Sequence, residues 1–450
     1  MKKSIATLSL IVSAAVCFAQ GPIITTWLQN NTVMGQHYVQ NNPTPIQDNV
    51  LANVQTVQYS TNWVYVSTNG IPAYITGPFL DGNPSLASDQ NAIFRYPLIP
   101  QPNTGNPTST TPGNIGIFIN GVALFDYRDG VSWRLASGTE QGGPIQGPPG
   151  DGVWNRDAVV AERLGFDCAK GHPAMGNYHH HQNPSAFDLD LNVLSTICST
   201  YDADGLYVID STVHSPLLGF AADGYPIYGA YGYQNTNGTG PIVRIKSSYQ
   251  LRNITVRTHY ADGSDVTDGP PVSTAYPLGR YREDYEFIAH PNDPDYLDEH
   301  NGRFCITPEF PNGTYAYFCT VDAGWNSAYP YAVGPTFYGI VAASKVTSIN
   351  EPTTIYTAPT GISQNDFEQL NIALYPNPSD EFIVLQAGSI VTANLQVRIY
   401  DNTGRLVQQS QISQGSTLAW IDTRTLYNGS YYAEVVSGES KRVLQFIVAH

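Results

Sequence analysis

Basic side chains are scarce in this sequence. Lys and Arg total 21 against 37 Asp and Glu, which gives a formal net charge of −16 over 450 residues. Such a chain repels phosphate backbones and anionic lipid, so we expect no nucleic-acid partner. Charged residues of both signs make up only 13% of the chain while apolar residues reach 42%, a balance that excludes a disordered protein.

Long apolar runs are missing after the first nineteen residues. The chain opens with Lys2 and Lys3, continues with the apolar run IATLSLIVSAAV, and reaches a small-residue cleavage point at Ala19. This pattern predicts a secretory signal peptide over residues 1–19, which is too short to span a membrane. We therefore expect export through the inner membrane and a mature chain with no transmembrane segment.

Cysteine is rare, and its count bears on the compartment. Five are present, of which four remain after the predicted signal peptide, and an even number in an exported chain favours disulfides. Three pairings are possible in principle. Local order favours Cys168–Cys198 and Cys305–Cys319, the second across an expected hairpin turn at FPNGTY. Thiolate metal ligands are the alternative, but no C-x-x-C spacing supports them.

Familiar catalytic signatures are also absent. The sequence contains no G-x-S-x-G elbow, no Gly-rich loop of the kind that cradles phosphates, and no H-E-x-x-H. We therefore expect no nucleotide cofactor. Whether the protein is an enzyme stays open, and no catalytic residue is assigned.

Turn formers and aromatic residues, in contrast, are plentiful. The chain holds 40 Gly, 32 Pro and 30 Tyr, and alternating runs such as NWVYVSTNG (62–70) are punctuated by Asn-Gly and Asp-Gly pairs. This texture predicts many short strands joined by turns. We expect a mainly β protein whose large β-rich domain covers residues 20–345 and has few short helices. One helix is expected over 154–165, with Glu162 facing solvent.

The C-terminal part of the chain has a different texture. Residues 346–370 contain few large apolar side chains and are expected to form a linker. Residues 371–450 then alternate apolar and polar positions, which predicts a small, immunoglobulin-like antiparallel β-sandwich.

Three motifs in this sandwich resemble the type A sorting domain of the type IX secretion system, found in Bacteroidota. They are Y-D-x-x-G-R at 400–405, L-x-x-G-x-Y-Y at 426–432, and the YPNP motif formed by Tyr375, Pro376, Asn377 and Pro378. The resemblance implies the type IX secretion machinery as a partner. It also implies transport across the outer membrane, so that the product is secreted or anchored at the outer surface.

Histidine is both scarce and concentrated. Five of the ten lie between residues 172 and 214, in or after the stretch HPAMGNYHHHQNP. If 178–181 is extended, His179 and His181 project to one face of the strand, because strand side chains alternate. Two imidazoles at this spacing can converge on one ion. Neutral imidazole suits Cu, Zn, Ni or Fe, whereas Ca or Mg would require a carboxylate cluster.

Further residues can complete such a site. His172 is expected to fold back across the turn at 174–176 as a third ligand, and His300 is a remote candidate for a fourth. Tyr178 and His180, on the other face of the strand, are expected to orient the imidazoles. The alternative is that the run is a solvated polar stretch, or that its histidines serve only the structure.

Several motifs in the same order resemble the YHYH domain family, over roughly residues 50–345. The Tyr-His-Tyr-His core of the family corresponds to Tyr178, His179 and His181, with His180 where the family has Tyr. The family has no settled activity, so a metal role follows from residue chemistry alone. The other matching motifs are GIFINGV at 116–122, GFAADGYPIYG at 219–229, LDEHNGRFCITPEFPNGTYAYF at 297–318 and YPYAVG at 329–334.

Two functions therefore remain. The first is a secreted or cell-surface metalloprotein that binds copper or zinc through His179 and His181. The second is a non-enzymatic extracellular module that binds glycan or protein through Tyr-rich loops, with structural histidines. For the first, metal affinity is expected to fall below about pH 6, since imidazole with a reference pKa of about 6.5 must be neutral to ligate.

Overall fold

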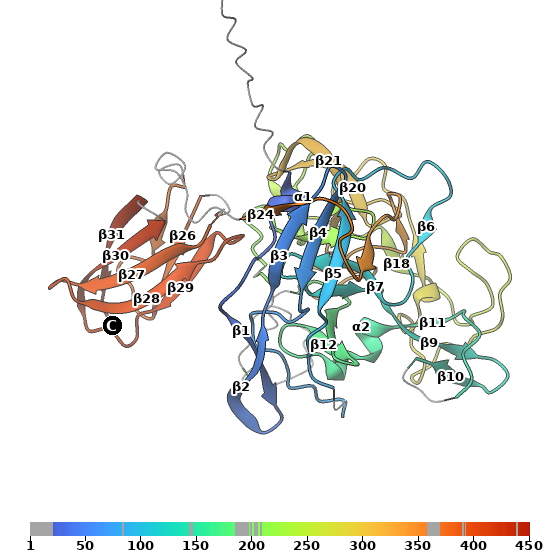
Figure 1. The fold of residues 1–450 in the computed structure, drawn as a ribbon. Helices are drawn as coiled ribbons and strands as arrows, with labels where there is room; N and C mark the ends of the chain where they lie inside the picture. Colours follow the sequence, from blue (N-terminus) through green and yellow to red (C-terminus); the bar gives the residue numbers. More distant parts are fainter. Residues whose placement is uncertain are drawn as a thin grey trace, which may run out of the picture.

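The chain folds into a large β-rich unit and a smaller C-terminal β unit, which Figure 1 draws as a separate orange-to-red lobe. The predicted signal peptide lies outside the described residues. No helix among the described residues is long and apolar enough to cross a membrane. The computed structural model describes residues 21–82, 85–143, 147–184, 198, 200–201, 206–207, 209–357, 370–388, 391, 393–437 and 440–450.

Two sheets form the centre of the large unit. The larger sheet has eight strands in the order β12 (Gly171–Ala174), β13 (Asn177–His180), β8 (Ala123–Phe125), β7 (Asn114–Phe118), β14 (Leu217–Ala221), β15 (Pro226–Tyr228), β21 (Phe310–Phe318) and β20 (Gly302–Thr307). The smaller sheet has five strands in the order β23 (Ser344–Val346), β5 (Ala92–Pro97), β4 (Trp63–Thr68), β3 (Val54–Tyr59) and β24 (Thr354–Tyr356).

Shorter elements surround these sheets. A three-stranded sheet has the order β10 (Thr139–Gly142), β9 (Arg128–Arg134), β11 (Asn155–Asp157). The two-stranded pairs are β1 (Met34–Val39) with β2 (Asn42–Leu51), β16 (Tyr231–Tyr233) with β17 (Ile242–Arg244), β18 (Tyr249–Leu251) with β19 (Tyr285–Phe287), and β6 (Thr108–Ser109) with β22 (Thr336–Phe337). In the described part of the chain, α-helix is confined to α1 (Pro22–Thr25) and α2 (Ala158–Ala161).

The main core lies between the two central sheets. Val57 and Val66 of the five-stranded sheet and Ile117 and Phe220 of the eight-stranded sheet belong to one fully buried cluster. The opposite face of the eight-stranded sheet is buried as well, in a second cluster that includes Phe118. Each such side chain contributes about 1.5–3 kcal/mol by leaving water. Because both faces are covered, polar side chains on this sheet are also held away from solvent.

The helix predicted over 154–165 is much shorter in the structure. Residues 155–157 form strand β11, α2 makes a single turn from Ala158, and a 3₁₀ turn follows at Arg163–Gly165. Asp157 caps α2, because its Oδ1 accepts the amides of Val159 and Val160. The break after one turn changes the direction in which Glu162 points.

The C-terminal unit is a two-sheet sandwich around its own core, so the mainly β fold class predicted from the sequence is confirmed. Its buried cluster includes Leu385 and Val397, one from each sheet. The first sheet has the order β25 (Ala373–Tyr375), β26 (Phe382–Gln386), β29 (Leu418–Asp422), and the second β28 (Leu406–Ile412), β27 (Leu395–Asp401), β30 (Gly429–Ser437), β31 (Ser440–Val448).

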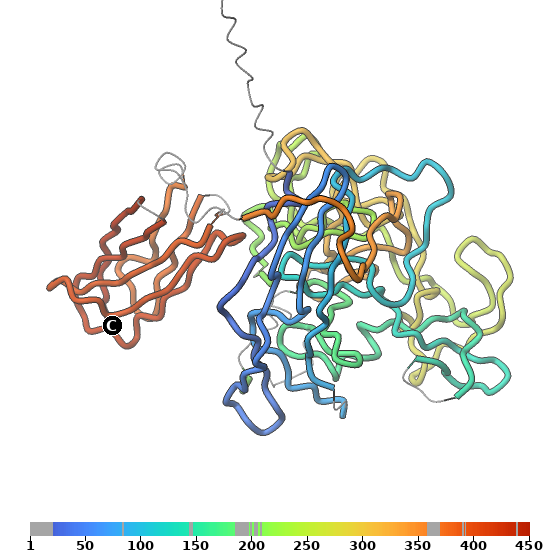
Figure 2. The backbone as a smooth tube through the Cα atoms, viewed as in Figure 1, coloured from blue at the N-terminus to red at the C-terminus, as the bar shows by residue number. Residues whose placement is uncertain are grey.

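The segment expected to be a linker is partly structured. Strand β24, inside 346–370, pairs antiparallel with β3, so the large unit continues to Tyr356. Figure 2 shows this orange segment running beside the blue strands of the N-terminal part. Residues 358–369 lie outside the described part of the chain.

One of the two predicted disulfides is present and the other is wrong. Cys168 and Cys198 are bonded, with Cα atoms 5.6 Å apart, whereas Cys305 and Cys319 are free and buried. The hairpin register explains the difference, because Cys305 lies opposite Thr314 and not opposite Cys319. Five residues of strand separate the positions by about 17 Å, far beyond the Cα distance that a disulfide spans.

Candidate metal centre

A tight hairpin brings two of the predicted ligands together. β12 and β13 are joined by Met175 and Gly176, whose φ angles of 48° and 86° are both positive, as a two-residue type I′ turn requires. This turn pairs His172 directly with His179 across the hairpin. Directly opposite residues share a face of the sheet, and the two ring centroids lie 4.5 Å apart.

His181 joins this pair two residues after His179, just beyond the end of β13. The three imidazoles offer nitrogen atoms that all lie within 4.8 Å of one another. His172, His179 and His181 are only 6%, 2% and 4% exposed, so this is no solvated polar run. The strand alternation expected from the sequence thus places the three candidate ligands together.

Backbone carbonyls fix the orientation of two rings. The Nδ1 atom of His179 donates to the carbonyl of Asn177 at 2.8 Å, and that of His181 to the carbonyl of Asp126 at 2.5 Å. A carbonyl only accepts, so each Nδ1 carries a proton, and each Nε2 presents a lone pair when its ring is neutral. These two Nε2 atoms lie 3.1 Å apart. Two lone pairs at that distance require a proton or a cation between them.

The walls of the centre come from neighbouring elements. β8 runs parallel to β13, and its last residue, Phe125, stacks on His179 with ring centroids 3.8 Å apart. Phe166 packs edge-on against His172 at 4.9 Å. These rings keep water away from the nitrogen atoms and hold the imidazoles in place.

One group at the centre was not predicted from the sequence. Glu162 was expected to face solvent, but its Oε2 lies 3.3 Å from Nε2 of His172 and 3.3 Å from Nε2 of His181. The expectation rested on a continuous helix over 154–165. Because α2 ends after one turn, the side chain of Glu162 points towards the β12–β13 hairpin and is only 20% exposed.

The pKa values of Glu162 and the three histidines are shifted in different directions. Burial, with the charge of His181, lowers the pKa of His172 to about 4, and burial lowers the pKa of His179 well below its ordinary value. Burial also disfavours the cation of His181, but the close contact with the Glu162 carboxylate and its negative charge outweigh burial and raise the pKa of His181. The pKa of Glu162 is lowered despite burial, chiefly by its close contact with His181. At neutral pH the centre therefore holds two neutral imidazoles and a carboxylate.

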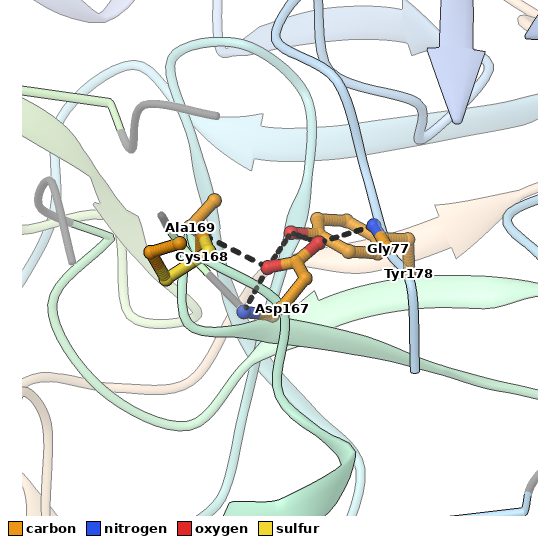
Figure 3. Close-up of a disulfide and its surroundings, with 7 residues drawn as sticks. Gly77, Asp167, Cys168, Ala169 and Tyr178 are labelled. Atoms are coloured by element: carbon orange, nitrogen blue, oxygen red, sulfur yellow. Dashed lines mark hydrogen bonds between the residues drawn. A yellow bond between two sulfur atoms is a disulfide. The ribbon is translucent and has the colours of Figure 1, made fainter. Parts of the chain in front are cut away.

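Tyr178 and His180 occupy the other face of β13 and serve the scaffold. Tyr178 Oη donates to both carboxylate oxygens of Asp167, at 2.9 and 3.1 Å, beside the Cys168–Cys198 disulfide (Figure 3). His180 contacts the carbonyl of Lys170 through Nδ1 and the hydroxyl of Tyr74 through Nε2. Their hydrogen bonds thus brace the hairpin, while the groups that orient His179 and His181 are backbone carbonyls.

His300, the remote candidate, lies elsewhere. Its Nδ1 contacts the hydroxyl of Thr336 at 2.6 Å, and it belongs to no ligand group with the three clustered histidines. No metal-ligand role follows for it from the described residues.

The comparison with protein families identifies the segment that carries this centre. Residues 93–329, slightly more than half of the chain, match the model described as YHYH protein. The chain belongs to the YHYH protein family. All four groups of the centre, from Glu162 to His181, lie inside the matched segment of this YHYH protein. A comparison with curated proteins finds no match.

A second family model covers the C-terminal sandwich. Residues 373–449 match a secretion system C-terminal sorting domain. The YHYH protein therefore carries a sorting domain of the type IX secretion system, which exports proteins to the cell surface or outside the cell. The motif Tyr375 to Pro378 opens this domain, with Tyr375 at the end of β25.

Proposed function

We propose that this exported YHYH protein binds a transition metal ion, copper or zinc, through His172, His179 and His181. One observation carries the proposal, namely three buried imidazoles on one hairpin face with two Nε2 lone pairs opposed at 3.1 Å. Structural histidines that only satisfy buried carbonyls would not need to point their remaining nitrogen atoms at one another.

The donor set matches this class of ion. Neutral imidazole nitrogen is a good ligand for zinc and copper and a poor one for calcium or magnesium, which require several oxygen atoms. The Nδ1–H bonds to the carbonyls of Asn177 and Asp126 are the usual outer contacts that fix the tautomer of a ligating histidine. The low pKa values of His172 and His179 keep both rings available to a metal at neutral pH.

The proposal places the site in an exported protein. Residues 1–19 would act as the signal peptide, and residues 371–450 would guide the protein through the outer membrane. The unit between them would carry the metal outside the cell. Binding of glycan or protein through Tyr-rich loops is the alternative function, and a protein that folds fully without any metal would favour it.

Metal analysis tests the proposal. The chain from residue 20 onward is folded under oxidising conditions, exposed to Cu²⁺ and Zn²⁺, desalted and measured by mass spectrometry of its metal content. We expect about one ion per chain, lost in the His179→Ala/His181→Ala variant. His214→Ala is the matched control, because His214 is a partly buried histidine outside the cluster. A folded wild-type protein that retains neither ion would contradict the proposal.

A further inference from the structure

We propose that Glu162 is the fourth ligand of this metal, so that the centre is a three-histidine, one-carboxylate site for a divalent ion in tetrahedral geometry. This inference rests on the proposed function and deepens it, because it selects the class of ion. Zinc is the ion whose preferred geometry such a site matches. Nothing in the sequence pattern around Glu162 marked it as a ligand.

The distances among the four ligand atoms carry the inference. Zinc bonds of about 2.0–2.1 Å at tetrahedral angles place neighbouring ligand atoms about 3.3 Å apart. Oε2 of Glu162 lies 3.3 Å from Nε2 of His172 and 3.3 Å from Nε2 of His181. The Nε2 atoms of His179 and His181 are 3.1 Å apart. Three edges of the expected tetrahedron are therefore already close to their final length.

Two atoms of the centre lack the partners that buried polar atoms normally have. Oε2 of Glu162 and Nε2 of His172 are both buried and make no hydrogen bond with any described residue. Leaving such atoms unsatisfied is unfavourable, and native structures usually provide each with a partner. A single ion bonded to both would satisfy them together.

The fold holds Glu162 in place from the far end of α2. The helix is fixed at its start, where the amide of Ala158 donates to the carbonyl of Tyr127 at 2.7 Å. Tyr331 donates its hydroxyl to Oδ2 of Asp157, the capping residue, also at 2.7 Å. The carbonyl one residue before Tyr127 belongs to Asp126 and holds the ring of His181. Consecutive carbonyls thus position both the helix that bears Glu162 and the imidazole that faces it.

The carboxylate decides which ions the site favours. Cu⁺ is a soft ion that prefers thiolate and thioether ligands, so a carboxylate adds little to its binding. A divalent ion gains both a hard oxygen ligand and a neutralising charge in a buried setting. Removing the charge of Glu162 should therefore lower the affinity for Zn²⁺ and leave Cu⁺ bound by the imidazoles.

Chelator competition on the oxidatively folded chain tests the inference. We expect Glu162→Gln to lower Zn²⁺ affinity by about tenfold or more, the range seen when the ligand environment of a zinc site is disturbed. Cu⁺ affinity should change less than about threefold. Glu299→Gln is the control, because Glu299 is 58% exposed and its nearest ionic partner is His300, outside the cluster. Co²⁺ substitution provides an independent readout, since the visible bands of tetrahedral Co²⁺ should change in Glu162→Gln.

The outcomes separate the two proposals. If the wild-type protein binds no metal, the proposed function fails. If Zn²⁺ binds and depends on His179 and His181 but is unchanged by Glu162→Gln, only the inference about Glu162 fails. Equal loss of Zn²⁺ and Cu⁺ would also overturn the assigned selectivity. Circular dichroism of the metal-free variant checks that it is folded, and Glu162→Asp serves as a second variant if it is not.

Discussion

His172 and His179 are direct antiparallel partners across one two-residue hairpin, with ring centroids 4.5 Å apart. The turn between them fixes this relationship, because a change in its length would shift the register and separate the rings. Met175, in the turn, has a φ of 48° although it is not glycine, and its side chain is almost fully exposed.

Met175→Asn should stabilise the protein. Asn tolerates positive φ far better than Met, and Asn-Gly is the preferred pair for this turn type, so a gain of about 0.5–1 kcal/mol in the free energy of unfolding is expected. Metal content should not change. Urea unfolding measures the gain. Val256→Asn is the comparison, because Val256 is also exposed but does not have a positive φ. An unchanged or lower midpoint would contradict the turn assignment.

His180→Ala should cost stability and leave the metal bound. The variant loses contacts to the carbonyl of Lys170 and the hydroxyl of Tyr74 and leaves a cavity at a fully buried position, a loss of about 2–4 kcal/mol. Because His180 points away from the three clustered imidazoles, metal content per folded chain should stay near the wild-type value. His179→Ala, one position earlier, should lose the metal. Loss of metal from folded His180→Ala would contradict the division of the strand into two faces.

Metal affinity should fall with decreasing pH because of His181 first. Its pKa is raised, so below that pKa its proton competes with the metal, and affinity should decrease about tenfold per pH unit. Above that pKa the proton is absent and affinity should level off. The fall therefore starts above pH 6.5, earlier than the limit of about pH 6 that unperturbed imidazole predicts. His172, with a pKa of about 4, adds a second proton only in strong acid.

Proton release on binding measures this coupling directly. Isothermal titration calorimetry with Zn²⁺ at pH 6, in two buffers of different ionisation enthalpy, should reveal close to one proton released per ion. A value near zero would show that His181 is already neutral at that pH. A value near three would show that all three imidazoles are protonated in the metal-free protein.

Loss of the Cys168–Cys198 disulfide should measurably lower the stability of the protein. Cys168→Ser/Cys198→Ser removes a cross-link between residues 30 positions apart, which corresponds to about 3.6 kcal/mol of unfolding free energy. Cys305→Ser, at a free and buried thiol, provides the comparison. Thiol titration of the denatured, unreduced chain from residue 20 onward should give two thiols. A count of zero would contradict the free state of Cys305 and Cys319.

The sequence predicted local relationships better than distant ones. Period-two alternation placed His179 and His181 on one face, and the turn residues before them allowed His172 to fold back, since both effects act within ten residues. The mainly β class followed from composition and turn chemistry in the same way.

Features set by long-range pairing escaped prediction. The stacking of Phe125 on His179 depends on a parallel pairing between β8 and β13, which no local pattern encodes. The prediction of a Cys305–Cys319 disulfide was wrong because the register of the β20–β21 hairpin places Cys305 opposite Thr314 and not opposite Cys319. Glu162 was not predicted as a ligand because α2 ends after Ala161 without a Gly or Pro in the sequence there to indicate a helix end.

Because strand side chains alternate, odd and even positions of the histidine run 179–181 lie on opposite faces of the strand. The side chains at odd positions, His179 and His181, face the candidate metal centre, while those at even positions, Tyr178 and His180, hydrogen-bond to the surrounding scaffold. An even position needs only a buried ring that can hydrogen-bond, which explains why His180 can stand where the family core has Tyr. The proposed metal centre needs an imidazole at each odd position. A single-residue insertion between His179 and His181 would place these two side chains on opposite faces of the strand and remove the centre, although every histidine of the run would be kept.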